Sequence, residues 1–451
     1  MSAIAPETAS PLPDQRQLED LVQQVLEESR RQGATAAEAS VSVGSGLSVQ
    51  VRKGEVDTLE HQRDRSLAVA VYFGKRQGAA SSADFSTDSV RSTVEAACAI
   101  ARHTSEDPAR GLAEPELLAR EIPDLDLYHP WGISADSAIE RALACEAAAL
   151  AVDDRITNSE AAGVSSNAGI RVYGNSNGFL GGYRSTRHDI SCVVIAEDDS
   201  GMQRDYWYTT ARGADALLSP EDVGRKAAAH ALRRLGGRQL PTARVPVIFH
   251  APVARGLLGH FVGAVRGGNL YRKASFLVDS LGRKVFADHI TLAERPHLPR
   301  GLGSAPFDHE GVATRPRDLV RDGVLQGYVL DTYSARKLGM TTTGNAGGVH
   351  NLALPPGRQD LDGLLRTMDR GVLVTELMGQ GINLVTGDYS RGASGFWVEG
   401  GEIAYPVEEI TIAGNLRDMF LGIREVGSDV DTRGGIHSGS ILVDGMTVAG
   451  E

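Results

Sequence analysis

Glycine clusters alternate with strand-forming residues through the C-terminal half of this chain, and they constrain its fold more than any other feature. Two clusters, Gly344–His350 and Gly379–Gly395, place glycine where the backbone must turn sharply or approach another group closely. In the segment Phe396–Tyr405, a Gly-Gly pair separates two strand-like runs, which is typical of a hairpin. We therefore predict a strongly twisted, antiparallel, β-rich domain here. Only three helices are expected in it: a short one containing His260, and others near residues 361–370 and 416–420.

The N-terminal half has a different pattern, in which helical periods alternate with short β-type runs. Helices are predicted over about 14–33, 86–102, 134–152 and 219–235, from apolar residues at helical spacing. Between them lie β-runs such as Glu38–Val43, Leu47–Val51 and Leu67–Phe73, with glycine-containing turns that indicate an antiparallel meander. The turn at Tyr173–Gly178 is the clearest, because Asn and Gly tolerate positive φ. The fold class predicted for the whole chain is α+β.

A chain of 451 residues exceeds one ordinary core, so several domains are expected. The break Gly236–Pro241 is the best boundary. We predict a flexible tail over 1–13, an N-terminal α+β domain over 14–104 and a connector over 105–133. A middle α+β segment over 134–238 should pack with the N-terminal domain, and the β-rich domain should occupy 239–451.

Composition excludes several classes of function. Lys plus Arg number 46 and Asp plus Glu 58, so the net charge of −12 argues against direct binding of nucleic acid. No apolar run is long enough for a membrane helix, and residues 1–13 do not resemble a signal peptide. The three cysteines, Cys98, Cys145 and Cys192, are too scattered for a disulfide framework, which favours reduced thiols and a cytoplasmic location.

Several segments carry a family resemblance. The segment 256–265, GLLGHFVGAV, is followed by Tyr271-Arg272-Lys273, and four further stretches match: 333–339, 375–381, 387–397 and 405–416. Together they resemble the TldD/PmbA family of peptidases, in particular its PmbA (TldE) type of subunit, which has no zinc motif. The resemblance extends over the C-terminal half and, more weakly, over the N-terminal half beyond the first dozen residues.

The zinc-bearing members of this family have a zinc-binding helix, and this chain lacks the ligands at the corresponding positions. Zinc-bearing members carry His-Glu-x-x-x-His, whereas Arg255, Gly256 and His260 occupy those positions here. The late cysteine is also absent, since the last one is Cys192. A catalytic zinc needs three protein ligands and an open position, so we expect no catalytic residue and no metal in this chain. Zinc is expected instead on a TldD-like partner subunit.

The resemblance therefore implies a heterodimeric metallopeptidase that degrades or processes unfolded and small peptides, including modified precursors. This chain would shape the substrate chamber. The residues expected to contact substrate are His260, Tyr271, Arg272, Tyr389, Arg391, Phe396 and Trp397. Each has a purely structural alternative. His260 could be a hydrogen-bonded histidine of the core, and Tyr271-Arg272-Lys273 could be an ordinary turn. The other four residues could pack within strands of the C-terminal core.

Three alternatives stay open. The chain could be a metallopeptidase by itself, through a non-standard site among the scattered His289, His297, His309, His350 and His437. It could be a non-enzymatic modulator of DNA gyrase, a role that the family resemblance also suggests. Alone, it could form a homodimer.

Overall fold

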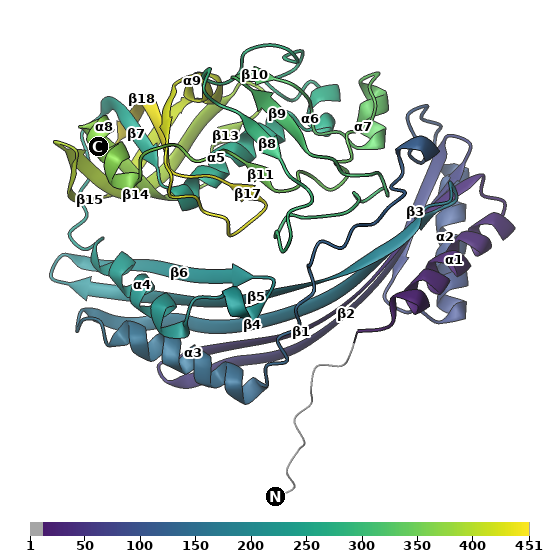
Figure 1. Ribbon diagram of the computed structural model, residues 1–451, viewed down its shortest axis with the longest axis horizontal. Helices are drawn as coiled ribbons and strands as arrows, with labels where there is room; N and C mark the ends of the chain where they lie inside the picture. The colour runs from purple at the N-terminus through teal and green to yellow at the C-terminus, as the bar shows by residue number, and fades with distance from the viewer. Residues whose placement is uncertain (1–11, 451) are drawn as a thin grey trace, which may run out of the picture.

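The computed structural model describes residues 12–450, and its N-terminal part is built on one six-stranded antiparallel sheet. The strand order is β3-β2-β1-β4-β5-β6, so each strand lies beside one of its neighbours in sequence. The sheet curves beneath the C-terminal elements (Figure 1). Its strands are β1 (Ala36–Arg52), β2 (Glu55–Phe73), β3 (Arg76–Ser82), β4 (Ile156–Asn175), β5 (Leu180–Asp198) and β6 (Gly201–Ala211).

The meander is confirmed, but the prediction of two short runs at Glu38–Val43 and Leu47–Val51 is wrong, because both belong to the continuous strand β1. Gly44 and Gly46 do not turn the chain. Gly44 pairs with Asp64 on one side and with Gly169 on the other. Pairing on both sides holds these glycines extended, and glycine adopts that conformation as readily as a turn.

Four helices cover the outer, convex face of this sheet in two pairs (Figure 1). One core joins the first pair to β1 and β2 through residues such as Val22, Val69 and Val94. A second core joins the other pair to β4 and β5, and it contains the free thiols Cys145 and Cys192. Each helix has a side-chain N-cap, at Asp14, Ser86, Ser134 and Ser219. The helices are α1 (Gln15–Arg31), α2 (Thr87–His103), α3 (Ala135–Leu150) and α4 (Pro220–Leu232).

Two further sheets, of seven and five strands, form the C-terminal part, and the larger contains the glycine-rich strands. Its order is β12-β7-β18-β15-β14-β13, with β16 beside β18 and an added pairing of β12 with β14. Gly400 and Gly401, both at positive φ, form the expected tight turn between β14 and β15. The strands are β7 (Ala243–Phe249), β12 (Gly371–Met378), β13 (Ile382–Asn383), β14 (Asp388–Glu399), β15 (Glu402–Asn415), β16 (Ile423–Val426) and β18 (Ile441–Ala449).

The second of these sheets has the order β10-β9-β8-β11-β17 and packs beside the helices of this region. Its short strands are β8 (Leu292–Glu294), β9 (Arg317–Arg321), β10 (Val324–Leu325), β11 (Leu352–Ala353) and β17 (Ile436–His437). A single large core, which includes Phe261, Phe286 and Phe420, fills the space between the two sheets and the helices.

The expected helices near His260, 361–370 and 416–420 are present as α5 (Ala251–Ala264), α8 (Leu361–Met368) and α9 (Leu416–Leu421). The prediction that there would be no others is wrong, because α6 (Gly267–Tyr271) and α7 (Thr332–Lys337) also form. Both are too short to show a helical period in the sequence. α6 also contains two glycines, which normally weaken a helix.

The mixture of antiparallel sheets and covering helices confirms the α+β fold class. The predicted connector runs from α2 to α3 and contains one short 3₁₀ helix, η1 (Pro115–Leu117); a second 3₁₀ helix, η2 (Ala214–Ala216), precedes α4. The predicted tail falls almost wholly outside the described residues. None of the described helices is long and apolar enough to cross a membrane.

Candidate functional site

The helix α5 carries the residues that the sequence singles out. Pro252 stands in its first turn, where the missing N–H costs nothing, and the helix follows directly from the buried strand β7. Leu257, Leu258 and Phe261 face the core and are almost completely buried. Because these three anchor one side of the helix, Arg255, Gly256 and His260 lie on its remaining surface.

Arg255 is bound to other parts of the protein. Its guanidinium donates to the Tyr208 hydroxyl on β6 over 3.1 Å and lies 3.6 Å from a carboxylate oxygen of Asp431. Asp431 is also held by Arg433 at 2.9 Å, and the Arg433 guanidinium lies 4.1 Å from the ring centroid of Trp207. Arg255 therefore joins α5 to the loop before β17 and to the N-terminal sheet.

Beside Arg255, one face of α5 is open. A methyl group added at Gly256 or Gly259 would meet no heavy atom within 4 Å, while one added at Gly263 would meet Leu384 at 3.2 Å. These positions recur at three and four residues, so they share a face with His260. The face is therefore uncovered at its N-terminal end and closed at its C-terminal end by the loop after β13.

His260, Tyr389 and Arg391 meet at the edge of this face. The rings of His260 and Tyr389 are in edge contact, with centroids 6.0 Å apart. The His260 Nε2 and the Tyr389 hydroxyl are both buried, and neither has a hydrogen-bond partner among the described residues. A buried polar atom without a partner costs free energy, so two such atoms in contacting rings are unusual.

In this group, Arg391 carries a positive charge, and the side chains of His260 and Tyr389 are neutral. Burial, with the neighbouring Arg391 cation, lowers the pKa of His260, so its imidazole is neutral at pH 7. Burial raises the pKa of Tyr389 to about 12. The Arg391 guanidinium donates to the Met378 carbonyl at 3.3 Å. The group therefore places one cation, Arg391, beside two neutral rings.

The other expected contacts lie elsewhere. Phe396 packs with Ile248 and Leu364 in a separate core on the far face of the sheet. Trp397 is buried, and Arg370 covers its ring at 5.3 Å.

Tyr271 and Arg272 stand at the end of α6, where Tyr271 is in edge contact with Tyr333 of α7 at 5.8 Å. The adjacent Lys273 has a positive φ, as residues in tight turns do. Of the seven expected contacts, the structure brings together three: His260, Tyr389 and Arg391.

The donor set at α5 does not fit a catalytic zinc. Arg255 is engaged in its own contacts, Gly256 has no side chain, and His260 supplies one imidazole. No group of three or more His, Cys, Asp or Glu side chains suited to a metal occurs within residues 12–450. His437, on β17, has its Nε2 2.9 Å from the Gly434 carbonyl. No step of a reaction is therefore assigned to a metal on this chain.

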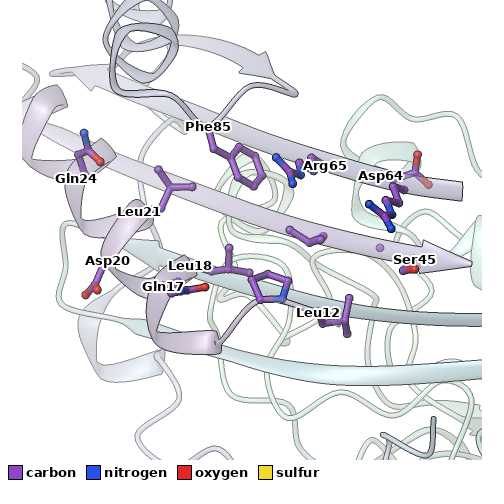
Figure 2. Close-up of a pocket in the computed structure, with 14 residues that line it drawn as sticks. Leu12, Gln17, Leu18, Asp20, Leu21, Gln24, Ser45, Asp64, Arg65 and Phe85 are labelled. Atoms are coloured by element: carbon purple, nitrogen blue, oxygen red, sulfur yellow. The ribbon is translucent and has the colours of Figure 1, made fainter. Parts of the chain in front are cut away.

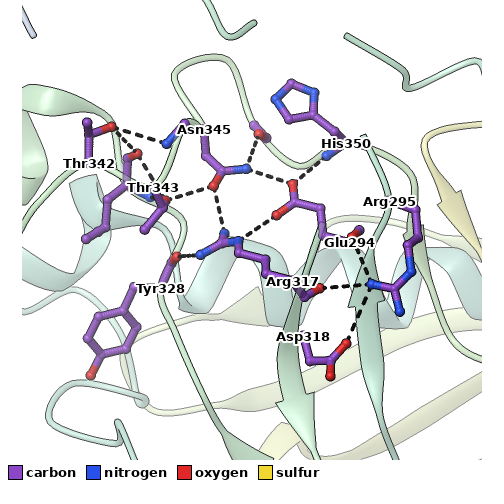
Figure 3. Close-up of polar contacts among 12 residues, drawn as sticks. Glu294, Arg295, Arg317, Asp318, Tyr328, Thr342, Thr343, Asn345 and His350 are labelled. Carbon is purple, nitrogen blue, oxygen red and sulfur yellow. Dashed lines mark hydrogen bonds and ion pairs between the residues drawn. The ribbon is translucent and has the colours of Figure 1, made fainter. Parts of the chain in front are cut away.

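Sequence reasoning missed the polar network that supports this part of the protein (Figure 3). The buried Glu294 carboxylate accepts from Arg317 at 2.8 Å and from the side-chain amide of Asn345 at 2.7 Å. It also accepts from the His350 backbone N–H at 2.7 Å. The buried Glu294 carboxylate thus helps to shape the glycine cluster at 344–350. Glu294 stands directly before Arg295, so nothing in the local sequence indicated a buried carboxylate.

Comparisons with known proteins agree with this geometry. Profiles of the PmbA/TldA metallopeptidase domain 1, central domain and C-terminal domain match residues 37–101, 128–235 and 242–450. Metalloprotease PmbA of Escherichia coli O157:H7 is 50% identical over 450 residues, which cover 100% of both chains. The chain belongs to the PmbA/TldD metallopeptidase family. Its resemblance to the family, first stated on motifs, is confirmed.

Further relatives place the chain within the family. The Metalloprotease PmbA homolog of Haemophilus influenzae is 48% identical over 97% of each chain, whereas the TldD homolog of the same organism is 26% identical over about half of each. A Bacteroides thetaiotaomicron crystal structure, presented as a candidate modulator of DNA gyrase, superposes with a TM-score of 0.91 at 28% identity, covering 96% of this chain and 99% of that one. TldE from Thermococcus kodakarensis shares the fold, with a TM-score of 0.84 at 21% identity over 95% and 100% of the two chains.

Proposed function

We propose that this family member is the non-catalytic subunit of a two-chain metallopeptidase. A TldD-like partner would hold the zinc and activate water, and the complex would cleave unfolded and small peptides, including modified precursors. One observation carries the proposal: on α5, the zinc-helix positions hold an arginine committed to Tyr208 and Asp431, a bare glycine and a single imidazole. These groups cannot supply the three ligands that a hydrolytic zinc requires.

The open face of α5 supports a role in holding peptide. His260 and Tyr389 have buried polar atoms with no partner among the described residues, and a shift of the side chains that cover them would let the backbone N–H and C=O groups of an extended peptide bind both. Exposed Met378 ends β12 and exposed Val385 follows β13, and both would provide apolar contact. Backbone recognition of this kind reads an extended chain with little dependence on its sequence.

The test uses three samples: this chain, its TldD-like partner, and the two mixed, each assayed on an unfolded protein with metal content measured by mass spectrometry. We expect zinc in every sample that contains the partner and none bound stoichiometrically to this chain. Cleavage should need the partner. Stoichiometric zinc and cleavage by this chain alone, both lost in His260→Ala, would overturn the proposal in favour of a metallopeptidase active by itself.

The peptide contact is tested separately in the mixed complex. Tyr389→Phe removes one hydroxyl and keeps the ring, so the complex should assemble normally while KM for peptide rises. His289→Ala serves as the control, because this exposed imidazole lies outside the group. An unchanged KM in both Tyr389→Phe and His260→Ala would show that peptide binds elsewhere in the complex.

A further inference from the structure

Two motifs of the sequence that the proposed function does not use meet at one end of the molecule. Tyr271-Arg272-Lys273 lies at the end of α6, and Tyr333 and Lys337 belong to α7. The rings of Tyr271 and Tyr333 are in edge contact, with centroids 5.8 Å apart. Figure 1 shows α7 at the end of the C-terminal part nearest β3. Each motif combines a tyrosine with nearby cations, so their contact gathers positive charge in one place.

The N-terminal part of the chain adds further cations at this place. The Arg110 guanidinium, on the connector, lies 4.2 Å from the ring centroid of Tyr333. Lys75, in the turn between β2 and β3, donates to the Arg110 carbonyl at 3.0 Å. These contacts join α6, α7, the connector and the β2–β3 turn into one surface. We name it the tyrosine–cation surface, and its members are Lys75, Arg110, Tyr271, Arg272, Lys273 and Tyr333.

The cations of this surface have no carboxylate partner. Within residues 12–450, no ion pair is formed by the side chains of Lys75, Arg110, Arg272 and Lys273. Neighbouring acids are already bound, because Asp107 accepts from Lys337 at 2.8 Å and Glu114 accepts from Arg336 at 2.7 Å. The positive charge of the surface is therefore available to a ligand, on a chain whose net charge is −12.

The two arginines are held by the tyrosine rings while their donors stay free. A guanidinium that stacks on a ring uses its flat face, and its N–H groups point outward in the plane. Arg110 is stacked over Tyr333, and the Arg272 guanidinium lies 5.3 Å from the ring centroid of Tyr271. An arginine held in this way loses less side-chain freedom when a carboxylate binds to it.

Other arginines of the chain lack this arrangement. Arg63 and Arg65 border a largely apolar pocket of about 500 Å³ between α1 and the strands (Figure 2). Arg65 also lies over a ring, 5.9 Å from the centroid of Phe85. However, Asp20 and Asp64 border the same pocket, so it has no excess of either charge. Stacked and unpaired cations are gathered without competing acids at the tyrosine–cation surface.

We propose that the tyrosine–cation surface binds an acidic segment of the peptide that the two-chain complex cleaves. Glutamate and aspartate carboxylates of the peptide pair with the unpaired cations, and the two tyrosine rings contact its backbone. A short acidic segment is favoured over a nucleic acid, because the positive charge is local and the rest of the acidic chain repels a longer polyanion. The inference rests on the proposed function and adds a substrate class to it.

The test is fluorescence anisotropy of a labelled peptide of alternating Glu and Gly residues, added to the isolated chain without partner or zinc. We expect saturable binding that weakens as salt rises. Arg272→Glu/Lys273→Glu should weaken it about tenfold, and Lys75→Glu, on a separate element, should weaken it in the same direction. Arg358→Glu/Arg366→Glu is the control, because it makes the same charge change at exposed arginines near α8 and should leave binding unchanged.

All of the substituted side chains are exposed, so the variants should keep the fold. In the mixed complex, Arg272→Glu/Lys273→Glu should raise KM for a peptide with an acidic segment and leave KM for its glutamine counterpart unchanged. The proposal would be overturned if the Glu peptide did not bind, if a Gln peptide or an oligonucleotide bound as tightly, or if KM for the acidic peptide did not change. Cleavage by this chain alone would overturn the proposed function and leave the anisotropy result standing, so the two failures are distinguishable.

Discussion

Gly256 shows most clearly what one residue decides in this protein. In a zinc-bearing relative this position would hold the glutamate that activates water, but here it exposes bare helix backbone to open space. Glycine in the interior of a helix is unfavourable because it loses more backbone freedom than other residues on folding. Glycine at position 256 therefore lowers the stability of the helix, and no contact made by this residue within the described chain offsets that loss.

We predict that Gly256→Ala stabilises the isolated chain by roughly 0.5–1 kcal/mol, since alanine fits without a clash and favours the helix. Urea denaturation measures the change. Gly263→Ala is the matched control: its methyl group meets Leu384 at 3.2 Å, so its gain should be smaller. If Gly256→Ala is no more stable than the parent, the face of α5 is not open in solution.

Glu310 makes the stability of the folded chain depend on pH. Burial, with the nearby Asp308 and Glu38, raises its pKa to about 7, although the Thr332 backbone N–H donates to it at 2.9 Å. The folded chain thus keeps this proton longer than the unfolded chain does. The contribution of Glu310 to the free energy of unfolding must fall as the pH rises from its ordinary pKa of 4.5 to about 7.

We predict that Glu310→Gln removes this loss, because glutamine is neutral at every pH and its oxygen can still accept from Thr332. The variant should match the parent near pH 4 and become more stable than the parent as the pH approaches 8. Unfolding curves of both proteins across this range give the difference. A constant difference at all pH values would mean that folding does not shift the pKa of Glu310.

At the scale of elements, the sequence predicted the long helices, because they show a clear periodicity of apolar residues. Helices α1 to α4 begin within about two residues of their predicted starts, because each has a capping side chain and an apolar stripe. The continuity of β1 was missed, since the pairing that keeps Gly44 extended comes from strands distant in sequence. The same limit applies to the site. Periodicity placed His260 on a helix, but only the fold brings Tyr389 beside it and separates Phe396 from it.

We predict that the hydrogen-bonded network around Glu294 contributes strongly to stability. Glu294→Ala should lower the free energy of unfolding by about 3–5 kcal/mol, because it leaves the Arg317 cation and the Asn345 amide without a buried acceptor. Chemical denaturation measures the loss. Asp288→Ala is the control, since its ion pair with Lys284 is exposed and should be worth less than about 1 kcal/mol. Equal effects of the two changes would contradict a buried role for Glu294.

At the scale of the whole molecule, the two parts of the chain are joined at both ends of the curved sheet. At one end, Arg433 donates to the Tyr208 carbonyl at 2.9 Å, and Arg255 reaches the hydroxyl of the same residue. At the other end, Arg336 of α7 binds the connector. Its guanidinium donates to the carbonyls of Ala109, Gly111 and Leu112 and to the carboxylate of Glu114. The motif that holds Arg336 therefore has a structural use that sequence reasoning did not find.

We predict that Arg336→Met loosens the connector without unfolding either part. Four acceptors lose their donor, and three of them are backbone carbonyls that water can reach once the segment moves away. Limited proteolysis should therefore cut residues 105–120 faster than in the parent, with the fragments on either side remaining intact. Arg120→Met is the control, because this exposed arginine makes no side-chain hydrogen bond or ion pair within the described residues. If the connector resists protease equally in all three proteins, its position is set by the packing of Leu118 and Phe179 against Phe307, and the arginine adds little.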